Sequence, residues 1–302
     1  MTQSSLGPVL CVIGARPNYM KMAPLLRAFA QTPALPAAVL VHTGQHYDPM
    51  LNDRLFSDLE LPAPDLNLEV GSGTHAVQTA EVMRRFEPVM DERAPSCVVV
   101  VGDVNSTLAC SVVAVKKGVP VVHVEAGLRS GDRAMPEEIN RVLTDQISDL
   151  LYTTERSAHA NLAREGIADE RIHFVGNLMI DSLMAALPKA VDVARTLAAA
   201  GYAGATPAAG EYGVVTLHRP SNVDEPTALR EVLQILGDVS QRMPLIWPMH
   251  PRTRASIERH GMGALLASPR LICLPAQGYL EMLGLMRGAR LVLTDSGGVQ
   301  EE

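Results

Sequence analysis

The sequence is poor in aromatic residues and cysteine, and it has no long apolar run. Aromatic side chains make up 4% of the 302 residues, and the four cysteines form no Cys-x-x-Cys pair. Cysteines scattered inside apolar runs argue against a disulfide framework or a zinc site, and they predict buried, reduced thiols in a cytoplasmic protein. No apolar run approaches the ~20 residues that span a bilayer, and residues 1–8 lack a signal-peptide pattern. We therefore expect no membrane partner. The cysteines are Cys11, Cys97, Cys110 and Cys273.

Basic charge is also in short supply. The chain has 26 Lys and Arg against 33 Asp and Glu, which gives a formal net charge of −7. This balance argues against a general nucleic-acid-binding protein, although a local basic pocket for one anion is still compatible with it.

Hydrophobic residues are abundant, at 47% of the chain, and they fall into short runs that alternate with amphipathic stretches. In the first half the short runs predict strands at 9–13, 38–41, 97–101, 119–124, 150–153 and 172–175. The stretches between them predict helices at 17–30, 76–92, 107–117, 137–149 and 157–165. Apolar strands joined by helices predict a parallel, doubly wound sheet.

The same scheme begins again near residue 176. Strands are predicted at 212–217, 245–249, 271–274 and 291–294, and helices at 227–242, 253–260 and 279–288. The length also suggests two domains. We therefore predict the α/β class with two Rossmann-like doubly wound domains facing a cleft, one at 1–176 and one at 177–302.

Ligands of doubly wound sheets bind beyond the carboxyl ends of the strands, so the residues that follow each strand are candidates for function. The first strand is followed by Gly14-Ala15-Arg16-Pro17-Asn18, with Lys21 one turn into the helix. Positive charge at a helix N-terminus suits a diphosphate, although a surface arginine and lysine beside a turn would give the same pattern.

Three acids occupy similar positions. Asp103 follows the strand 97–101, Glu125 follows the strand 119–124, and Glu137 opens the next helix. Asp103 could simply cap a helix and Glu137 could compensate a helix dipole, but together they suit proton transfer or a divalent metal. Basic residues already accompany these acids, so we expect no metal.

The second half adds three groups that follow strands. His218 follows the first of its strands, Gln277 follows the third, and Ser296-Gly297-Gly298 follows the last. A Ser-Gly-Gly turn that enters a helix presents backbone N–H groups to phosphate, and Glu302 one turn later could accept hydrogen bonds from ribose hydroxyls. The run Gly71-Ser72-Gly73-Thr74-His75-Ala76 matches a dinucleotide fingerprint only loosely, because no well-placed acid completes it.

Taken in order, these motifs resemble the non-hydrolysing UDP-N-acetylglucosamine 2-epimerases. The matching segments run from residue 9 to the end of the chain. They are Gly14-Ala15-Arg16-Pro17, Thr43-Gly44-Gln45-His46, Gly102-Asp103, His123-Val124-Glu125-Ala126-Gly127-Leu128-Arg129, Pro136-Glu137-Glu138-Ile139-Asn140-Arg141, His218-Arg219 and Asp295-Ser296-Gly297-Gly298-Val299-Gln300-Glu301-Glu302.

The resemblance implies a glycosyltransferase-B-like fold, a homodimer and no cofactor. It implies interconversion of UDP-N-acetylglucosamine and UDP-N-acetylmannosamine by elimination and re-addition of UDP through a 2-acetamidoglucal. On this basis Asp103, Glu125 and Glu137 are acid/base candidates, and His218 supports the diphosphate. The residues at the family's nucleotide-binding positions are Arg16, Lys21, Gln277, Ser296, Gly297, Gly298 and Glu302.

Several alternatives are still open at this point. Relatives of the family include hydrolysing epimerases and epimerases of diacetamido uronic acid nucleotides, and the motifs do not separate these substrates. Tyr47-Asp48 stands where allosterically activated members carry Arg-Glu, which argues against activation by a second substrate molecule. The chain also stops at the turn presenting Ser296 and Glu302, so we expect a truncated second domain. If the truncation is real, a UDP-sugar-binding protein without catalysis is the competing hypothesis, and a glycosyltransferase on the same fold is a third.

Overall fold

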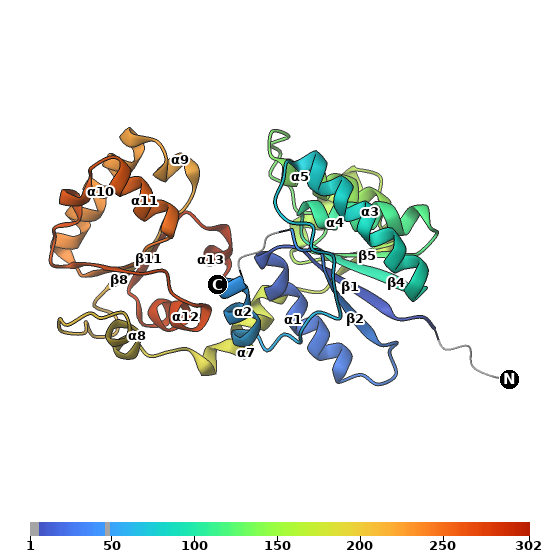
Figure 1. Ribbon diagram of the computed structural model, residues 1–302, viewed down its shortest axis with the longest axis horizontal. Helices are drawn as coiled ribbons and strands as arrows, with labels where there is room; N and C mark the ends of the chain where they lie inside the picture. Colours follow the sequence, from blue (N-terminus) through green and yellow to red (C-terminus); the bar gives the residue numbers. More distant parts are fainter. Residues whose placement is uncertain (1–5, 46–48) are drawn as a thin grey trace. The chain divides into compact units, whose positions relative to one another are not determined.

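The chain forms two compact units, each an α/β domain with its own parallel sheet (Figure 1). The computed structural model describes residues 6–45 and 49–302, apart from the side chains of residues 49–53. Unit 1 is Met1–Ser182 and unit 2 is Leu183–Glu302.

Unit 1 contains a seven-stranded sheet of order β3-β2-β1-β4-β5-β6-β7, in which every pair is parallel. Every strand of this sheet is short. They are β1 (Val9–Ile13), β2 (Ala38–His42), β3 (Leu66–Asn67), β4 (Cys97–Val101), β5 (Val121–Val124), β6 (Leu150–Thr153) and β7 (Ile172–Phe174). The central strands β1 and β4 are almost wholly buried, which explains their unbroken apolar sequence.

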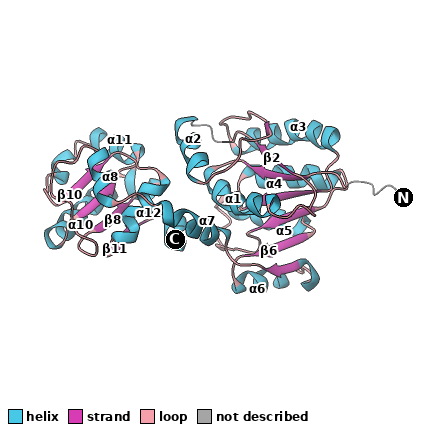
Figure 2. Ribbon diagram, turned by 90° about the horizontal axis from the view of Figure 1, so that it is seen from below, coloured by secondary structure: helices cyan, strands magenta, loops and turns pink. Residues whose placement is uncertain are grey.

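Helices cover both faces of this sheet (Figure 2). The helices that begin in unit 1 are α1 (Arg16–Ala30), α2 (Pro49–Asp58), α3 (His75–Arg93), α4 (Asn105–Lys116), α5 (Pro136–Ile147), α6 (Arg156–Arg164) and α7 (Leu178–Ala186), with a 3₁₀ turn at Asp169–Arg171. The Ser182 hydroxyl in the middle of α7 donates to the Met20 carbonyl, which ties α7 to α1.

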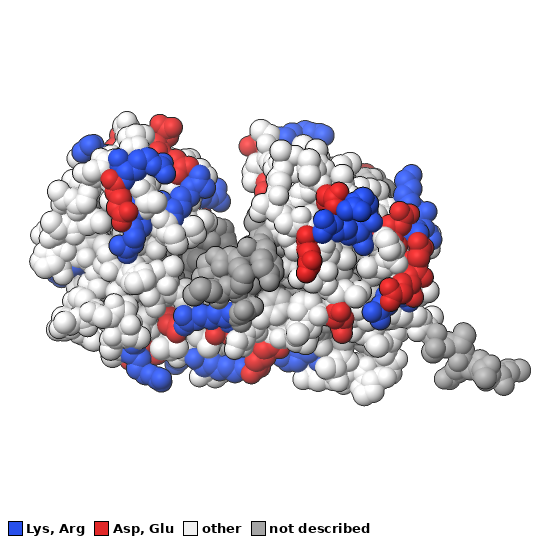
Figure 3. All heavy atoms as spheres, viewed as in Figure 1, with Lys and Arg blue, Asp and Glu red and all other residues white. Residues whose placement is uncertain are grey.

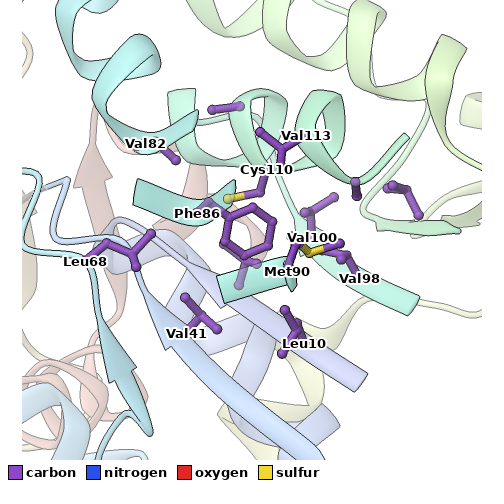
Figure 4. Close-up of a cluster of buried hydrophobic side chains, with 14 residues drawn as sticks. Leu10, Val41, Leu68, Val82, Phe86, Met90, Val98, Val100, Cys110 and Val113 are labelled. Atoms are coloured by element: carbon purple, nitrogen blue, oxygen red, sulfur yellow. The ribbon is translucent and has the colours of Figure 1, made fainter. Parts of the chain in front are cut away.

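The largest core of unit 1 lies between β1, β4 and the pair α3–α4 (Figure 4). The Phe86 ring from α3 lies at its centre, with Met90 from the next turn and Cys110 from α4 around it. Leu10 and Val100 rise from the sheet beneath them. Alternate residues of β1 therefore enter this core, and the others face α1 on the opposite side of the sheet.

Unit 2 has a smaller, four-stranded parallel sheet of order β10-β9-β8-β11. Its strands are β8 (Gly213–Thr216), β9 (Leu245–Pro248), β10 (Leu271–Leu274) and β11 (Leu291–Thr294). Its helices are α8 (Val193–Ala199), α9 (Pro220–Val223), α10 (Pro226–Arg242), α11 (Pro251–Arg259), α12 (Tyr279–Gly288) and α13 (Gly297–Glu301), with 3₁₀ turns at Leu187–Lys189 and Gly263–Leu266. Trp247 of β9 is fully buried under the leucines of α10, and Tyr212 is buried on the other face beside α12.

The strands predicted from apolar runs are confirmed, and several match to the residue, as 97–101 and 271–274 do. The sequence patterns did not predict α2, α7, α9 or the two-residue strand β3. Residues 66–70 around β3 do alternate apolar and polar side chains, which is a strand signal, but they follow Pro62 and Pro64 directly. The prediction of buried thiols holds for Cys11 and Cys110. It is wrong for Cys97 and Cys273, which are partly exposed, although all four are free.

The described residues contain no helix long and apolar enough to cross a membrane. On the face seen in Figure 3, basic and acidic side chains alternate in small groups.

Candidate active site

The turn after β1 depends on a close approach that only glycine permits. A Cβ atom on Gly14 would lie 2.8 Å from Thr43 Oγ1 and would also collide with Ser106 Oγ, and these two hydroxyls are 2.7 Å apart. The Asn18 carboxamide oxygen accepts from the N–H groups of Gly14 and Ala15, while its Nδ2 donates to the Val101 carbonyl of β4. Asn18 therefore joins the carboxyl ends of β1 and β4.

Lys21 and Glu125 form a buried ion pair at this edge of the sheet. Lys21 Nζ lies 2.6 Å from both Glu125 carboxylate oxygens, and about a tenth of each side chain is exposed. Arg16, at the start of α1, is exposed instead. The structure thus places Lys21 against an acid predicted for catalysis.

Glu125 has a backbone conformation that L-residues rarely adopt. Its φ is +68°, and its N–H and that of Ala126 both donate to the Tyr152 carbonyl of β6. Non-glycine residues in this region cost about 1–3 kcal/mol and tend to occur at functional sites. Gly102, at φ +65°, lies alongside, with the position of its missing Cβ 3.5 Å from Lys21 Nζ and 3.6 Å from Glu125 Oε1.

Asp103 follows β4, which pairs directly with β5, so Asp103 and Glu125 lie at the ends of adjacent strands. The Asp103 carboxylate forms an ion pair with Arg141 of α5, and its backbone oxygen accepts from Asn140 Nδ2 at 2.9 Å. Asp103 does not act as the N-cap of α4, because that position is Val104 and has no side-chain cap.

A pocket of about 320 Å³ opens beside Asp103. Glu137 at the first turn of α5 lines it together with Asp103, His75 of α3 and Gln45. Asn105 and Asn140 complete its polar wall, and Asn140 Nδ2 lies 3.2 Å from Asn105 Oδ1. Two of the three predicted acids therefore share one pocket, and amide and imidazole groups surround them.

Glu138, the neighbour of Glu137, has a different role. Its carboxylate accepts from the N–H groups of Ser130 and Gly131 and pairs with Arg141. Burial would raise the pKa of Glu138, but these hydrogen bonds outweigh it and lower the pKa. Glu138 thus fixes the loop before α5.

In unit 2 the His218 ring is oriented by Asp295. His218 Nδ1 lies 2.8 Å from Asp295 Oδ1, and the carboxylate also accepts from the backbone N–H groups of His218 and Arg219 and from Asn222 Nδ2. These donors outweigh burial and hold the pKa of Asp295 below its usual range. Since the carboxylate only accepts, Nδ1 carries a proton and Nε2 is the atom of the half-exposed ring available for other partners.

Ser296, Gly297 and Gly298 form the turn from β11 into α13. Ser296 Oγ accepts from Val299 N at 3.4 Å, and Ser296 N donates to Thr294 Oγ1 at 3.0 Å. Glu302 follows α13, and burial raises its pKa.

Gln277 follows β10. Two strands, β9 and β8, lie between β10 and β11, so β10 and β11 are about 14 Å apart at the usual strand spacing. The Gln277 amide nitrogen donates to the Pro275 carbonyl. Gln277 is therefore at the opposite end of this sheet edge from Ser296.

No group of three or more His, Cys, Asp or Glu suited to a metal ion occurs in the described part of the chain. His46, Tyr47 and Asp48, which carry part of one motif and the argument on activation, lie outside the described residues.

The residues that hold the predicted ones in place were not predicted from the sequence. Asn18, Asn140 and Asp295 stand inside the quoted motifs, so their place in those motifs was the available signal. His75 stood only inside the loose fingerprint of residues 71–76, and it reaches the pocket from the start of α3.

Comparison with known proteins identifies the family. Residues 28–302 match the sequence model of the UDP-N-acetylglucosamine 2-epimerase family. The chain is 38% identical over 294 residues to UDP-N-acetylglucosamine 2-epimerase of Methanococcus maripaludis, covering 96% of this chain and 78% of that protein. It is also 38% identical over 297 residues to UDP-2,3-diacetamido-2,3-dideoxy-D-glucuronate 2-epimerase of Pseudomonas aeruginosa, covering 97% and 79%.

The fold comparison agrees. The structure of Methanocaldococcus jannaschii UDP-GlcNAc 2-epimerase in complex with UDP-GlcNAc and UDP matches with a TM-score of 0.83 at 37% identity, covering 97% of this chain and 80% of that one. This confirms the predicted α/β, glycosyltransferase-B-like fold class. The chain belongs to the UDP-N-acetylglucosamine 2-epimerase family.

Proposed function

We propose that this protein interconverts UDP-N-acetylglucosamine and UDP-N-acetylmannosamine without hydrolysis and without a cofactor. The observation that carries the proposal is the set of acids at the carboxyl ends of β4 and β5 and the start of α5, namely Asp103, Glu125 and Glu137, next to Lys21.

The chemistry requires such a set. No carbonyl acidifies the C2 proton of the sugar, so direct deprotonation is too difficult. Removal of that proton together with cleavage of the bond from C1 to the UDP oxygen gives 2-acetamidoglucal and UDP. Addition of UDP back to C1, with protonation of C2 on the opposite face, gives the epimer. Two proton transfers on opposite faces need at least two positioned acid/base groups.

The acids of unit 1 supply these groups in our proposal. The Lys21 ammonium has three N–H donors. It pairs with the Glu125 carboxylate and can also donate a hydrogen bond to a phosphate oxygen of the substrate. Arg16 adds a guanidinium at the start of α1. A departing UDP gains negative charge, which positioned cations stabilise.

In our proposal unit 2 supplies the remaining nucleotide contacts. Nε2 of His218, oriented through Nδ1 by Asp295, is proposed to support the diphosphate. Ser296, Gly297 and Gly298 are proposed to bind phosphate through the turn into α13, Glu302 the ribose and Gln277 the uracil. We also propose that the protein is a homodimer, which light scattering of the purified protein tests directly. Its proposed location is the cytoplasm.

Product analysis by NMR tests the function. The protein incubated with UDP-N-acetylglucosamine should give UDP-N-acetylmannosamine, with no free N-acetylmannosamine. Release of free sugar and UDP would make it a hydrolysing epimerase, and consumption only with an added acceptor would make it a glycosyltransferase. If the substrate is unchanged but calorimetry shows that UDP binds, the protein is a UDP-sugar-binding protein without catalysis.

A second substrate has specific support, because the Pseudomonas aeruginosa relative is as similar as the Methanococcus maripaludis one. The same assay with UDP-2,3-diacetamido-2,3-dideoxy-D-glucuronate decides between them. If kcat/KM is higher for the diacetamido sugar, that sugar replaces UDP-N-acetylglucosamine as the proposed substrate.

A further inference from the structure

His123 lies in the interior of β5 and is completely buried, yet both of its ring nitrogens have polar partners. Nδ1 is 2.6 Å from Asp145 Oδ1 on α5, and Nε2 is 2.8 Å from the backbone oxygen of Gly102. The acid/base scheme above makes no use of this histidine, although it lies two residues before Glu125 and its partner Gly102 directly precedes Asp103.

The partners decide how many protons the ring carries. A backbone carbonyl can only accept, so Nε2 must carry a hydrogen. The other oxygen of Asp145 accepts from Arg129 Nη2 at 2.7 Å and from Gly127 N at 3.1 Å, which is the environment of an ionised carboxylate. An ionised carboxylate also only accepts, so Nδ1 carries a hydrogen as well. The ring is therefore an imidazolium.

The surrounding charges lead to the same conclusion. Arg129 pairs with both Asp145 and Glu165, and Lys21 pairs with Glu125. With His123 charged, this group of six side chains holds three cations and three anions. With His123 neutral, it would hold one uncompensated negative charge at a buried position, which is costly.

The pKa directions agree with this arrangement. Burial alone would lower the pKa of His123, but the Asp145 carboxylate, the Gly102 carbonyl and the Glu125 charge raise it overall. Asp145 shows the converse, because His123 and Arg129 outweigh its burial and lower its pKa.

The imidazolium acts on the backbone that carries Asp103. Gly102 is at φ +65°, where its N–H donates to Val124 and its oxygen is held by His123. The next residue, Asp103, is held on its far side by Asn140 and Arg141. The turn is thus fixed from the sheet side by His123 and from the helix side by α5.

We propose that His123 is a positioning residue that remains an imidazolium throughout the working pH range and, with Asp145, fixes the Gly102–Asp103 turn and the adjacent Glu125 for proton transfer. Its catalytic consequence rests on the proposed function, whereas its protonation state does not.

The first test measures protonation without any substrate. Two-dimensional ¹H–¹⁵N NMR of protein with ¹⁵N-labelled histidine reports which ring nitrogens of the nine histidines carry hydrogens. The signal lost in His123→Gln identifies His123. We expect both nitrogens to remain protonated well above the ordinary histidine pKa of about 6.5. A neutral ring at pH ~7.5, or titration near the ordinary value, would overturn the proposal.

The second test separates positioning from packing. Asp145→Asn removes the carboxylate but keeps its size, and we expect His123 to lose its Nδ1 proton and kcat to fall about 10- to 100-fold. KM and the calorimetric affinity for UDP should change less than about twofold, because the substitution impairs proton transfer and not substrate binding. An unchanged kcat, or an unchanged imidazolium signal in this variant, would overturn the proposal.

The matched control is Asp169→Asn. Asp169 pairs with His159 at 2.7 Å, but this pair is exposed on the surface of unit 1. The substitution should leave kcat and the His123 signal unchanged. If the unaltered protein has no epimerase activity, the proposed function fails while the NMR test of His123 still gives its answer. If Asp145→Asn does not fold, the NMR test of the unaltered protein decides alone.

Discussion

Glu125 combines two features that are rarely found together in one residue, a left-handed backbone and a buried ion pair with Lys21. A residue strained in this way persists only where the surrounding structure holds it. Here the Tyr152 carbonyl accepts from its N–H, and Gly102 leaves room beside its carboxylate. At the scale of single residues, this is the strongest sign that the position was selected for its chemistry.

Glu125→Gln should reduce epimerisation by about 100-fold or more, because an amide cannot accept the proton that a general base removes. UDP affinity measured by calorimetry should remain within a few-fold, since Glu125 itself is not among the proposed nucleotide-binding residues. Glu69→Gln is the control, because Glu69 also has a positive φ, of 51°, but is exposed and lies outside the candidate pocket. Normal turnover by Glu125→Gln would remove this residue from the mechanism.

Asp295→Asn should lower kcat/KM about 10-fold or more, because the carboxylate is what holds His218 Nδ1 and the backbone N–H groups around it. Steady-state kinetics with UDP-N-acetylglucosamine measures this. Asp224→Asn in the same unit serves as the comparison, since Asp224 pairs with Arg252 on the surface. Equal effects of the two substitutions would argue against an orienting role for Asp295.

At the scale of elements, the strand ends bring distant residues together. Gly14, Thr43 and Ser106 follow β1, β2 and β4, and their contacts fix the three strand ends relative to one another. Gly237, by contrast, lies in α10 with open space where its Cβ would be.

These two glycines predict opposite outcomes for the same change. Gly14→Ala should destabilise the protein by about 1–3 kcal/mol, because the new methyl group collides with two hydroxyls. Gly237→Ala should stabilise it by about 0.5–1 kcal/mol, because alanine loses less conformational freedom in a helix. Thermal unfolding of both variants measures the difference, and a Tm for Gly14→Ala at or above that of the parent would contradict the packing described.

The elements also show what the sequence could and could not predict. Buried parallel strands such as 97–101 are unbroken apolar runs, so their positions follow directly from the sequence. The residue types at their carboxyl ends identified Asp103, Glu125 and His218. The partners of these residues could not be predicted in the same way, because Lys21 lies 104 positions from Glu125 and Asp145 lies 22 positions from His123. Such contacts depend on strand order and on the placement of α1 and α5, which a local pattern does not encode.

At the scale of the whole molecule, several carboxylates contribute stability that depends on pH. Glu138, Asp145 and Asp295 all have lowered pKa values in the folded protein. In the unfolded chain their pKa values are about 3.9 for aspartate and about 4.3 for glutamate. Above these values the stabilisation is fully present, and it is lost as the pH falls toward the lower folded pKa values.

The midpoint of thermal unfolding should therefore fall steeply once the pH drops below about 4, as protons bind to the unfolded chain first. Asp145→Asn should flatten this acid limb, because one of the shifted carboxylates is gone, while the exposed-site control Asp169→Asn should keep it. Differential scanning calorimetry across the acid range measures both. A Tm independent of pH between about 5 and 3 would contradict the charge network.

The central claim is that the acids of unit 1 remove and return the C2 proton of a UDP-acetamido sugar. Incubation with UDP-N-acetylglucosamine in D₂O, followed by NMR of the recovered nucleotide sugars, tests it most directly. The account predicts deuterium at C2 in the manno product and, after equilibration, in the recovered substrate. Epimer formed with its C2 hydrogen retained, or folded protein that leaves the substrate intact without exchange, would contradict it.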